Sequence, residues 1–373
     1  THRPDCFGIL GVAREVAGIQ GLAYKSPDWY LNGEKPKIID NLPLEVKVED
    51  SEFVPRFMAV AMSDIQVMPS PIWLQSLLAK VGIKPINNIV DLTNYYSLLT
   101  GQPLHAYDYD KVAMLSDQMP IIKARKAKKG ENIALLNGKT IEFEAPTIVI
   151  ATDKQAIGVG GVIGGSETEV DENTKNIILE CATFNMYNIR RTSMKYGLFT
   201  DAVTRFTKGQ SIYQTDRILF KIISDVVDNC GGVVASEVFD IKNSLPEKKK
   251  VTVSAAFINE RLGSKLSKAE IKRLLENVEF VVDIKDDDLV VDYPFWRTDI
   301  HIPEDIVEEI GRLYGYDNLP LQLPSRTNTP VTKDHMLDLK QKIRSTLAAA
   351  GSNEVLTYSF VHGDLIEKVG QDK

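Results

Sequence analysis

The chain has 373 residues, of which 43% are hydrophobic and 25% are charged, as in globular proteins. This length exceeds what one ordinary hydrophobic core supports, so we expect two or three domains. The net charge of −7 argues against a protein that coats nucleic acid without regard to sequence, because affinity for phosphates comes from Lys and Arg. No apolar run is long enough to cross a bilayer.

The chain has three cysteines, Cys6, Cys181 and Cys230, without the spacing of metal ligands. A sparse, odd set of this kind suits a reducing cytoplasm better than a disulfide framework. Because the sequence begins at Thr1 and stops soon after a strand-like run at 355–360, we expect it to be a fragment of a longer protein.

The N-terminal part contains a short helical pattern, GILGVAREVAGIQG, within residues 1–22, which we interpret as the tail of another module. Residues 23–45 are rich in Pro, Lys and Asp and are expected to form a linker. A strand is predicted at 57–65. Apolar residues at helical spacing predict a helix after Pro71, ending at Gly82, and a second helix over 88–99.

Residues 119–183 contain short β-branched runs separated by turn residues, which predicts a largely β region. Helical patterns follow at 185–195 and 213–229. Residues 46–242 are therefore predicted to form one α/β domain with a β middle flanked by helices. Pro246 and the lysines after it are expected to mark a domain boundary.

A small winged-helix-like α+β module is predicted over 246–320. Ser267 and Glu270 have the spacing of a capping box, which predicts a helix to about Asn277. Two strands are expected at 279–284 and 288–293, and a helix at 302–316. Residues 321–332 are interpreted as a linker. A helix is predicted at 333–350 and the first strand of an unfinished sheet at 354–360, so 333–373 would begin a further, truncated domain.

Basic residues gather in three runs, of which those at 123–129 and 190–195 are candidates for contact with RNA. The alternative is that each run is a solvated surface or a linker with no role in binding. They are Lys123 to Lys129, then Arg190, Arg191 and Lys195, and then Lys248 to Lys250.

The glycine-rich run Gly158–Gly165, GVGGVIGG, resembles a phosphate-binding loop only superficially. No Lys-Ser/Thr pair follows it, and the next residues are acidic. Glycine also allows close approach of a strand or ligand to bare backbone. Packing and the wall of a small-molecule pocket therefore both stay open.

Glu180 and His105 are ambiguous on the residues alone. Strand alternation puts Ile178, Glu180 and Ala182 on one face, and a carboxylate in such company is costly unless it is paired or used. Glu180 would then face solvent on an edge strand or accept a hydrogen bond from a ligand. His105 follows a Gly-Gln-Pro break after the helix and would pack, recognise a ligand or take part in catalysis.

Four carboxylates, Asp299, Asp305, Glu308 and Glu309, could gather near the start of the 302–316 helix. Oxygen ligands of this kind suit Mg²⁺. Acidic residues in the first turn of a helix also complement its dipole with no metal present.

Five segments together resemble the β subunit of bacterial phenylalanyl-tRNA synthetase, in the same order along nearly the whole chain. They are THRPDCFGILGVAREVAG, NNIVDLTNYYSLLTGQPLHAYD, IGVGGVIGG, ILECATFNMYNIRRTSMKYGLFTDAVTRFTKG and PFWRTDIHIPEDIVEEIGRLYGYDNLP. The resemblance implies that 46–242 is an editing domain and that 246–320 is the small module that follows it.

In that family the α subunit forms the aminoacyl-adenylate, and the editing domain of the β subunit hydrolyses tyrosine wrongly esterified to tRNA(Phe). The resemblance therefore implies a cytoplasmic ligase subunit in an α2β2 heterotetramer, with tRNA(Phe), the α subunit and tyrosine as partners. ATP would serve the whole enzyme and not this fragment. Mg²⁺ would be shared with the α subunit.

The resemblance also assigns residues by motif. His105 and Glu180 would be catalytic, with Glu180 accepting the tyrosine phenol and His105 holding groups in place. The substrate-binding residues would be Thr93, Asn94, Gly161, Thr200 and Ala202. The metal ligands would be Asp299, Asp305, Glu308 and Glu309.

Two residues depart from the family pattern. Gly160 stands where Ala is common, and Val203 where a small polar residue is common. Gly160, Gly161 and Ala202 are expected to leave room for the ring. The alternative function is a non-catalytic region that binds tRNA and supports the α subunit. Editing requires His105 and Glu180 to converge on one pocket.

Overall fold

Strand β2, Arg56–Ser63, is buried along its whole length in the computed structural model. The structure describes residues 3–117, 119–144, 146–243, 245, 247 and 249–371. The predicted boundary at Pro246, and Thr1 and Lys248, lie outside the described residues. The chain divides into two compact units, Thr1–Pro320 and Leu321–Lys373. No helix among the described residues combines the length and apolarity needed to span a membrane.

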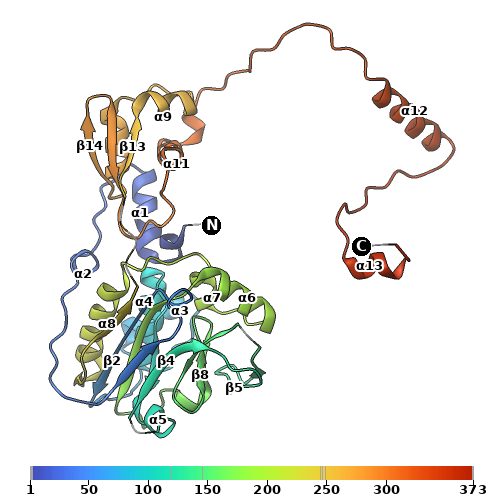
Figure 1. The fold of residues 1–373 in the computed structure, drawn as a ribbon. Coiled ribbons are helices and arrows are strands. Elements are labelled where there is room, and N and C mark those ends of the chain that lie inside the picture. Colours follow the sequence, from blue (N-terminus) through green and yellow to red (C-terminus); the bar gives the residue numbers. More distant parts are fainter. Residues whose placement is uncertain are drawn as a thin grey trace. The chain divides into compact units, whose positions relative to one another are not determined.

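Two sheets form the large α/β region of the first unit (Figure 1). One has the order β11-β2-β10-β3, with β12 also pairing with β2, and its pairings are antiparallel. The other has the order β1-β4-β7-β8-β9, and only β1 and β4 are parallel. The first sheet consists of β2, β3 (His105–Asp108), β10 (Ile177–Thr183), β11 (Val233–Val234) and β12 (Phe239–Lys242). The second consists of β1 (Glu45–Val48), β4 (Ile121–Lys126), β7 (Ile148–Ala151), β8 (Ala156–Val159) and β9 (Ile163–Gly164). A separate two-stranded sheet is formed by β5 (Asn132–Ala134) and β6 (Thr140–Glu142).

The α/β fold class and the predicted β middle are confirmed, because strands β4 to β10 all fall within 119–183. Four helices lie close to the predicted positions, α3 (Ile72–Lys80), α4 (Asn88–Thr100), α6 (Met186–Tyr196) and α8 (Thr215–Cys230). Two short helices, α5 (Tyr109–Met114) and α7 (Asp201–Phe206), were not predicted. Short 3-10 turns occur at Pro4–Phe7, Ser166–Thr168 and Tyr316–Asn318.

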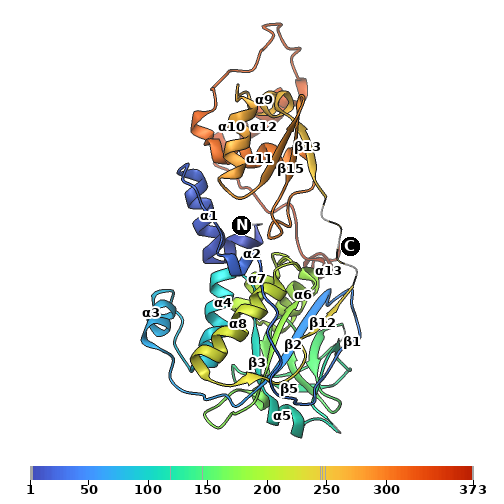
Figure 2. The same cartoon turned by 90° about the vertical axis from the view of Figure 1, so that its left-hand side faces the viewer.

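Strand β2 separates two hydrophobic cores because its side chains alternate between the two faces of the sheet. Phe57, Ala59 and Ala61 join the core shared with the second sheet. Met58, Val60 and Met62 join the core under α4 and α8. Figure 2 shows these two helices on one side of β2 and β3, with the strands of the second sheet on the other. The face of β2 that carries Phe57, Ala59 and Ala61 is therefore the face opposite to α4 and α8.

The segment predicted as a linker at 23–45 contains a short helix, α2 (Asp28–Leu31), in which Tyr30 is buried against the core of α4 and α8. The hydroxyl of Tyr30 donates to Gln214 Oε1 at 2.9 Å. Within this segment α2 is thus packed on the domain, whereas residues 33–43 form no helix or strand.

The small module has the predicted helix, helix, hairpin, helix order, preceded by one strand that the sequence did not reveal. Its elements are β13 (Val251–Ser254), α9 (Ala255–Leu262), α10 (Lys268–Glu276), β14 (Val281–Lys285), β15 (Asp288–Asp292) and α11 (Pro303–Tyr314). Strand β13 pairs with β15, giving a three-stranded antiparallel sheet. The capping box of Ser267 and Glu270 is present at the start of α10.

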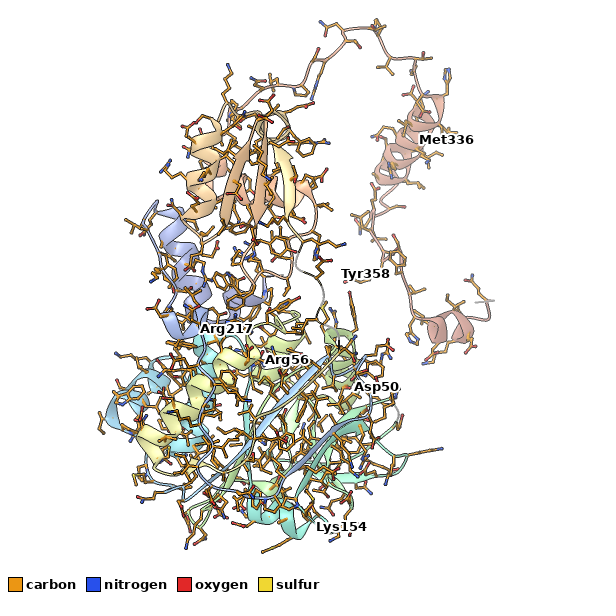
Figure 3. All side chains as sticks on the ribbon, turned by 60° about the vertical axis from the view of Figure 1, so that its left-hand side comes forward. Asp50, Arg56, Lys154, Arg217, Met336 and Tyr358 are labelled. Atoms are coloured by element: carbon orange, nitrogen blue, oxygen red, sulfur yellow. The ribbon has the colours of Figure 1, made fainter. Side chains whose placement is uncertain are left out.

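In the second unit, α12 (His335–Ala349) confirms the predicted helix, and its first amides are capped by Asp334. The strand predicted at 354–360 is wrong: no strand forms among the described residues 321–371, and α13 (Gly363–Lys368) follows. A strand is stable only beside a pairing neighbour, and this unit offers none. Met336 and Tyr358, labelled in Figure 3, are 58% and 92% exposed.

Helix α1 (Ile9–Ile19) is joined to the small module by a buried arginine. Arg14 is 1% exposed, and its guanidinium donates to Glu279 Oε2 at 2.7 Å and to Ser26 Oγ at 2.8 Å. It also lies 3.9 Å from the centre of the Trp296 ring. The contacts of Arg14 with Glu279 and Trp296 connect segments that are more than 250 residues apart in the chain.

We predict that Arg14→Ala lowers the free energy of unfolding by about 3 kcal/mol or more, because it leaves Glu279 without its buried partner. Urea unfolding followed by circular dichroism measures the change. Arg190→Ala, on the exposed side of α6, is the control, with an expected change within about 0.5 kcal/mol. Equal effects of the two substitutions would contradict the prediction.

Candidate functional site

The Gly-Gln-Pro break sets the start of β3. Helix α4 ends at Gly101, which has φ 81°, and the Gly101 amide donates to the Ser97 carbonyl. Gln102 is fully buried, and its Nε2 donates to the carbonyls of Pro103 and Ala182 at 3.0 and 2.8 Å. Because Ala182 belongs to β10, the break ties the start of β3 to its neighbouring strand.

The pairing of β3 with β10 puts His105 directly opposite Glu180. Alternation then puts Tyr107 and Ile178 on the same face. Glu180 is 7% exposed on a strand that has β2 on one side and β3 on the other. The edge-strand interpretation of Glu180 is therefore wrong, and the two residues that editing requires do converge.

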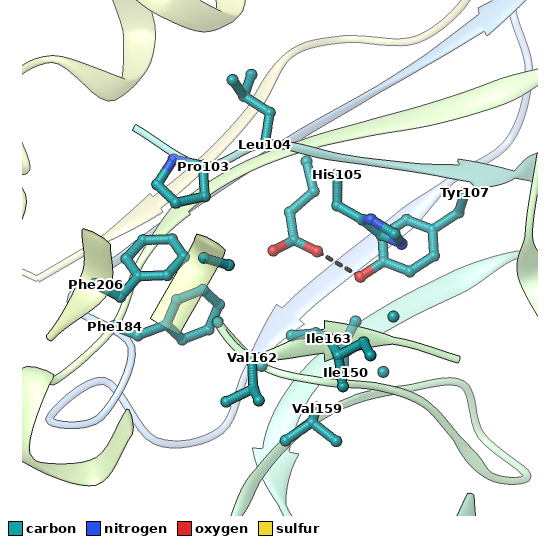
Figure 4. Close-up of a pocket in the computed structure, with 16 residues that line it drawn as sticks. Pro103, Leu104, His105, Tyr107, Ile150, Val159, Val162, Ile163, Phe184 and Phe206 are labelled. Carbon is teal, nitrogen blue, oxygen red and sulfur yellow. Dashed lines mark hydrogen bonds between the residues drawn. The ribbon is translucent and has the colours of Figure 1, made fainter. Parts of the chain in front are cut away.

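A cavity opens on this face of the sheet, and most of the residues that line it have apolar side chains or are glycine (Figure 4). His105 and Tyr107 lie on one side of it, and Phe184 and Phe206 on the other. The remaining lining residues are Pro103, Leu104, Ile150, Gly158, Val159, Gly160, Gly161, Val162, Ile163, Gly164, Glu180 and Ala202.

The Tyr107 hydroxyl donates a hydrogen bond of 2.5 Å to Glu180 Oε2, drawn as the dashed line in Figure 4. The rings of His105 and Tyr107 meet edge to face, with 4.5 Å between their centres. Tyr107 was not singled out by the sequence reasoning. Its position two residues after His105, in a run that continues as a strand, is the signal that would have found it.

The glycine segment forms one wall of the cavity, and its glycines are needed because other side chains occupy the space behind them. A Cβ on Gly161, which has φ 68°, would lie 2.7 Å from Ile189 and 2.8 Å from Phe184. A Cβ on Gly160 would lie 2.9 Å from Ile148. Gly160 therefore lines the cavity with its backbone, while protein side chains occupy the space that its Cβ would need.

Three predicted substrate-binding residues are absent from the lining of this cavity. Thr93 and Asn94 belong to α4, which packs on the opposite face of the sheet. The Thr93 hydroxyl donates to the Val90 carbonyl within its own helix. Thr200 instead caps α7 and donates to the Val162 carbonyl at 2.7 Å. It thereby holds α7, and with it Ala202, against the glycine segment.

Three family models match the chain in succession. Residues 54–231 match the B3/4 domain, residues 251–316 the tRNA synthetase B5 domain, and residues 319–373 the phenylalanyl tRNA synthetase beta chain CLM domain. The phenylalanine–tRNA ligase beta subunit of Carboxydothermus hydrogenoformans is 37% identical over 370 residues, which are 99% of this chain and 45% of that protein.

The chain belongs to the phenylalanine–tRNA ligase beta-subunit family. A beta subunit from Bacillus cereus strain ATCC 14579 is 36% identical over 97% of this chain and 44% of its own length. The chain thus spans less than half of these relatives. An N-terminal fragment of the beta subunit from Pyrococcus horikoshii aligns with 84% of this chain and 85% of its own at 19% identity. Its TM-score of 0.39 is too low to bear on the fold.

In this beta-subunit chain, the pocket shifts the acid–base properties of its titratable side chains. Burial raises the pKa of Glu180 to about 7, although the hydrogen bond from Tyr107 lowers it. Enclosure by the pocket walls lowers the pKa of His105 to about 4. Burial and the neighbouring carboxylate raise the pKa of Tyr107 well above its usual value. At neutral pH His105 is therefore neutral and Tyr107 is a hydrogen-bond donor.

The four carboxylates of the predicted magnesium site do not fit a metal ion in this structure. Arg297 donates to Asp299 at 2.8 and 2.6 Å and to Glu309 at 2.6 Å. Asp305 accepts hydrogen bonds from the backbone amides of His301 and Ile302 at 2.7 and 2.9 Å. The side chains of Asp299, Asp305 and Glu309 are thus committed to arginines or to the helix start. Among the described residues no three His, Cys, Asp or Glu side chains gather as metal ligands.

Glu309 is a strong partner for the arginines. Burial would raise its pKa, but hydrogen bonds from Arg312 and Arg297 outweigh this effect and lower the pKa to about 2. Glu309 therefore stays ionised at neutral pH, and its charge is balanced by the guanidinium groups of Arg297 and Arg312.

We predict that the cost of burying ionised Glu180 is visible in the pH dependence of stability. The folded-state pKa of about 7 lies above the ordinary 4.5, so the folded state binds the proton more tightly, and stability falls as the pH rises through this window. Glu180→Gln lacks this loss. Its free energy of unfolding relative to the unsubstituted protein should therefore rise by up to ~3 kcal/mol between pH 5 and pH 8.

Urea unfolding at a series of pH values measures this difference. Glu172→Gln, at an exposed position, is the control and should give a difference that does not change with pH. A pH-independent difference for Glu180→Gln as well would contradict a raised pKa at this site.

We predict that millimolar Mg²⁺ leaves the melting temperature of the chain unchanged, because arginines hold two of the four carboxylates. Asp305→Asn should lower the free energy of unfolding by about 1 kcal/mol through the weakened helix cap, equally with and without Mg²⁺. A Mg²⁺-dependent rise in melting temperature that Asp305→Asn abolishes would establish the metal site instead. Thermal unfolding by calorimetry distinguishes the two outcomes.

Proposed function

We propose that this chain is the editing part of a phenylalanine–tRNA ligase beta subunit and hydrolyses tyrosine wrongly esterified to tRNA(Phe). The observation that carries the proposal is the buried carboxylate of Glu180, which lies opposite His105 in a cavity whose lining residues, apart from His105 and Tyr107, are otherwise apolar or glycine. The alternative, a purely tRNA-binding and supporting region, has no need of such a carboxylate, whose burial is costly.

The chemistry of discrimination follows from one hydroxyl group. A hydrophobic synthetic pocket rejects an added hydroxyl only weakly, so tyrosine escapes the first selection. In the cavity Glu180 would accept the hydrogen bond of the tyrosine phenol on Oε1, while phenylalanine would leave this oxygen without a hydrogen bond. A hydrogen bond to a charged group contributes about 1.5–3 kcal/mol, which corresponds to about 10- to 100-fold in rate.

The hydrolytic step would use water. Water adds to the ester carbonyl carbon, the bond to the terminal ribose oxygen breaks, and tyrosine and tRNA with a free ribose hydroxyl are released. With a pKa of about 4, His105 is neutral at working pH, so it would orient the water or the ester by hydrogen bonding instead of donating a proton as an acid. The proton released from water passes to the leaving ribose oxygen.

The wider assignments belong to this proposal too. The ligase would act in the cytoplasm as an α2β2 assembly, in which ATP and Mg²⁺ serve the α subunit's synthetic site. Of the basic runs, the one at 123–129 is largely neutralised, because Lys123, Arg125 and Lys126 pair with acidic side chains. Arg190 and Arg191 are exposed on α6 and are the better candidates for contact with tRNA.

The test is deacylation of Tyr-tRNA(Phe) and Phe-tRNA(Phe) by the complete ligase and by its Glu180→Ala and Glu180→Gln variants. The unsubstituted enzyme should hydrolyse the tyrosine ester faster, and both variants should lose about 10-fold or more of that preference. Melting temperatures of the variants check folding. Equal rates on the two esters, or an unchanged preference in both variants, would refute the proposal.

A further inference from the structure

Glu180 already has a phenol as its hydrogen-bond partner before any substrate enters. The Tyr107 hydroxyl lies 2.5 Å from Oε2, and both side chains are buried. Glu180 Oε1 accepts no hydrogen bond from the described residues, and Glu180 lines the cavity. One carboxylate oxygen is therefore occupied and the other is available to a ligand.

We propose that Tyr107 is a positioning residue that sets the specificity of the pocket by holding Glu180, so that only Oε1 is left to accept the hydroxyl of a phenolic amino acid. The inference deepens the proposed editing of tyrosine esters and rests on it. Tyr107 acts through Glu180 and need not touch the substrate itself.

Two physical effects support this role. First, a carboxylate held by a short hydrogen bond from a buried donor keeps one orientation, whereas a glutamate side chain alone has several rotamers. Second, donation to the charged form favours that form, and the Tyr107 hydrogen bond lowers the pKa of Glu180 against the effect of burial. Tyr107 thus favours the ionised acceptor that a phenol needs.

The surroundings of Glu180 offer no substitute for Tyr107. The titratable groups that face it come from β3 and are His105 and Tyr107. On its other side β2 presents Ala59, and the other lining residues are apolar or glycine. Since His105 is neutral near pH 7, Tyr107 supplies the one strong donor to the carboxylate among the residues that line the cavity.

Tyr107→Phe tests the inference in the complete ligase, because it keeps the ring that packs against His105 and removes the donor. We expect the preference for Tyr-tRNA(Phe) over Phe-tRNA(Phe) in kcat/KM to fall about 10-fold near neutral pH, the usual result of losing a hydrogen bond to a charged group. The rising limb of kcat/KM against pH, which follows ionisation of Glu180, should move to higher pH.

Incorporation of 2,3-difluorotyrosine at position 107 gives the opposite shift and retains the size of the side chain. Its more acidic phenol donates a stronger hydrogen bond, so the same limb should move to lower pH. This second substitution also keeps the test decisive if Tyr107→Phe folds poorly.

Tyr109→Phe is the matched control. The Tyr109 hydroxyl donates to the Pro43 carbonyl at 2.5 Å and lies outside the cavity lining. It should change the melting temperature without changing the preference or the pH profile. If the unsubstituted ligase prefers Tyr-tRNA(Phe) but neither substitution at position 107 moves the preference or the pH limb, the role of Tyr107 is refuted. If the unsubstituted ligase shows no preference, the proposed function fails first.

Discussion

A shift of one residue in the pairing of β3 with β10 would turn His105 and Tyr107 to the opposite face of the sheet. The observed register depends on the turn at Gly101 and on Gln102, whose buried amide donates to a carbonyl of β10. Because Gln102 is fully buried, a different register would leave its amide unsatisfied inside the protein. The same few residues therefore end the helix, start the strand and aim two polar side chains into one cavity.

The buried carboxylate of Glu180, which the proposed recognition of a hydroxyl requires, lowers the stability of the folded protein when it is ionised. A carboxylate among apolar walls is costly to ionise, and the pKa of Glu180 near 7 is the measure of that cost. A second selection step that must detect a single hydroxyl needs an acceptor that is otherwise unsatisfied. In the proposed editing role, the hydrogen bond from Tyr107 satisfies one oxygen of Glu180 and leaves the other for the ligand.

In the small module and α1, several acidic residues form ion pairs with arginines. Arg14 pairs with Glu279, Arg297 pairs with Asp299 and Glu309, and Arg312 pairs with Glu309 and Glu15. Buried guanidinium groups require such partners, because an isolated buried charge is strongly destabilising. The pairs of Arg14 with Glu279 and of Arg312 with Glu15 link α1 with the small module, so these two carboxylates contribute to the assembly of the first unit.

Local patterns in the sequence were sufficient to predict most helices, the β middle, the capping box of α10 and the alternation that puts Glu180 with Ile178 and Ala182. Each depends on residues close together in the chain, where propensity and periodicity act directly. The resemblance to a known family added His105 and Glu180 as partners, and their convergence agrees with it.

Which elements become neighbours was decided only by the tertiary structure. Thr93 and Asn94 precede His105 by 12 and 11 residues in the sequence, but they lie on a helix that covers the other face of the sheet. In the sequence Asp299 and Glu309 have the pattern of metal ligands, but in the structure their carboxylates pair with Arg297. No spacing rule connects Arg297 with both of them. The run at 354–360 has strand-like residues but no strand beside it. The sequence by itself determined which groups need a partner, and the packing of distant segments decided which partner each one has.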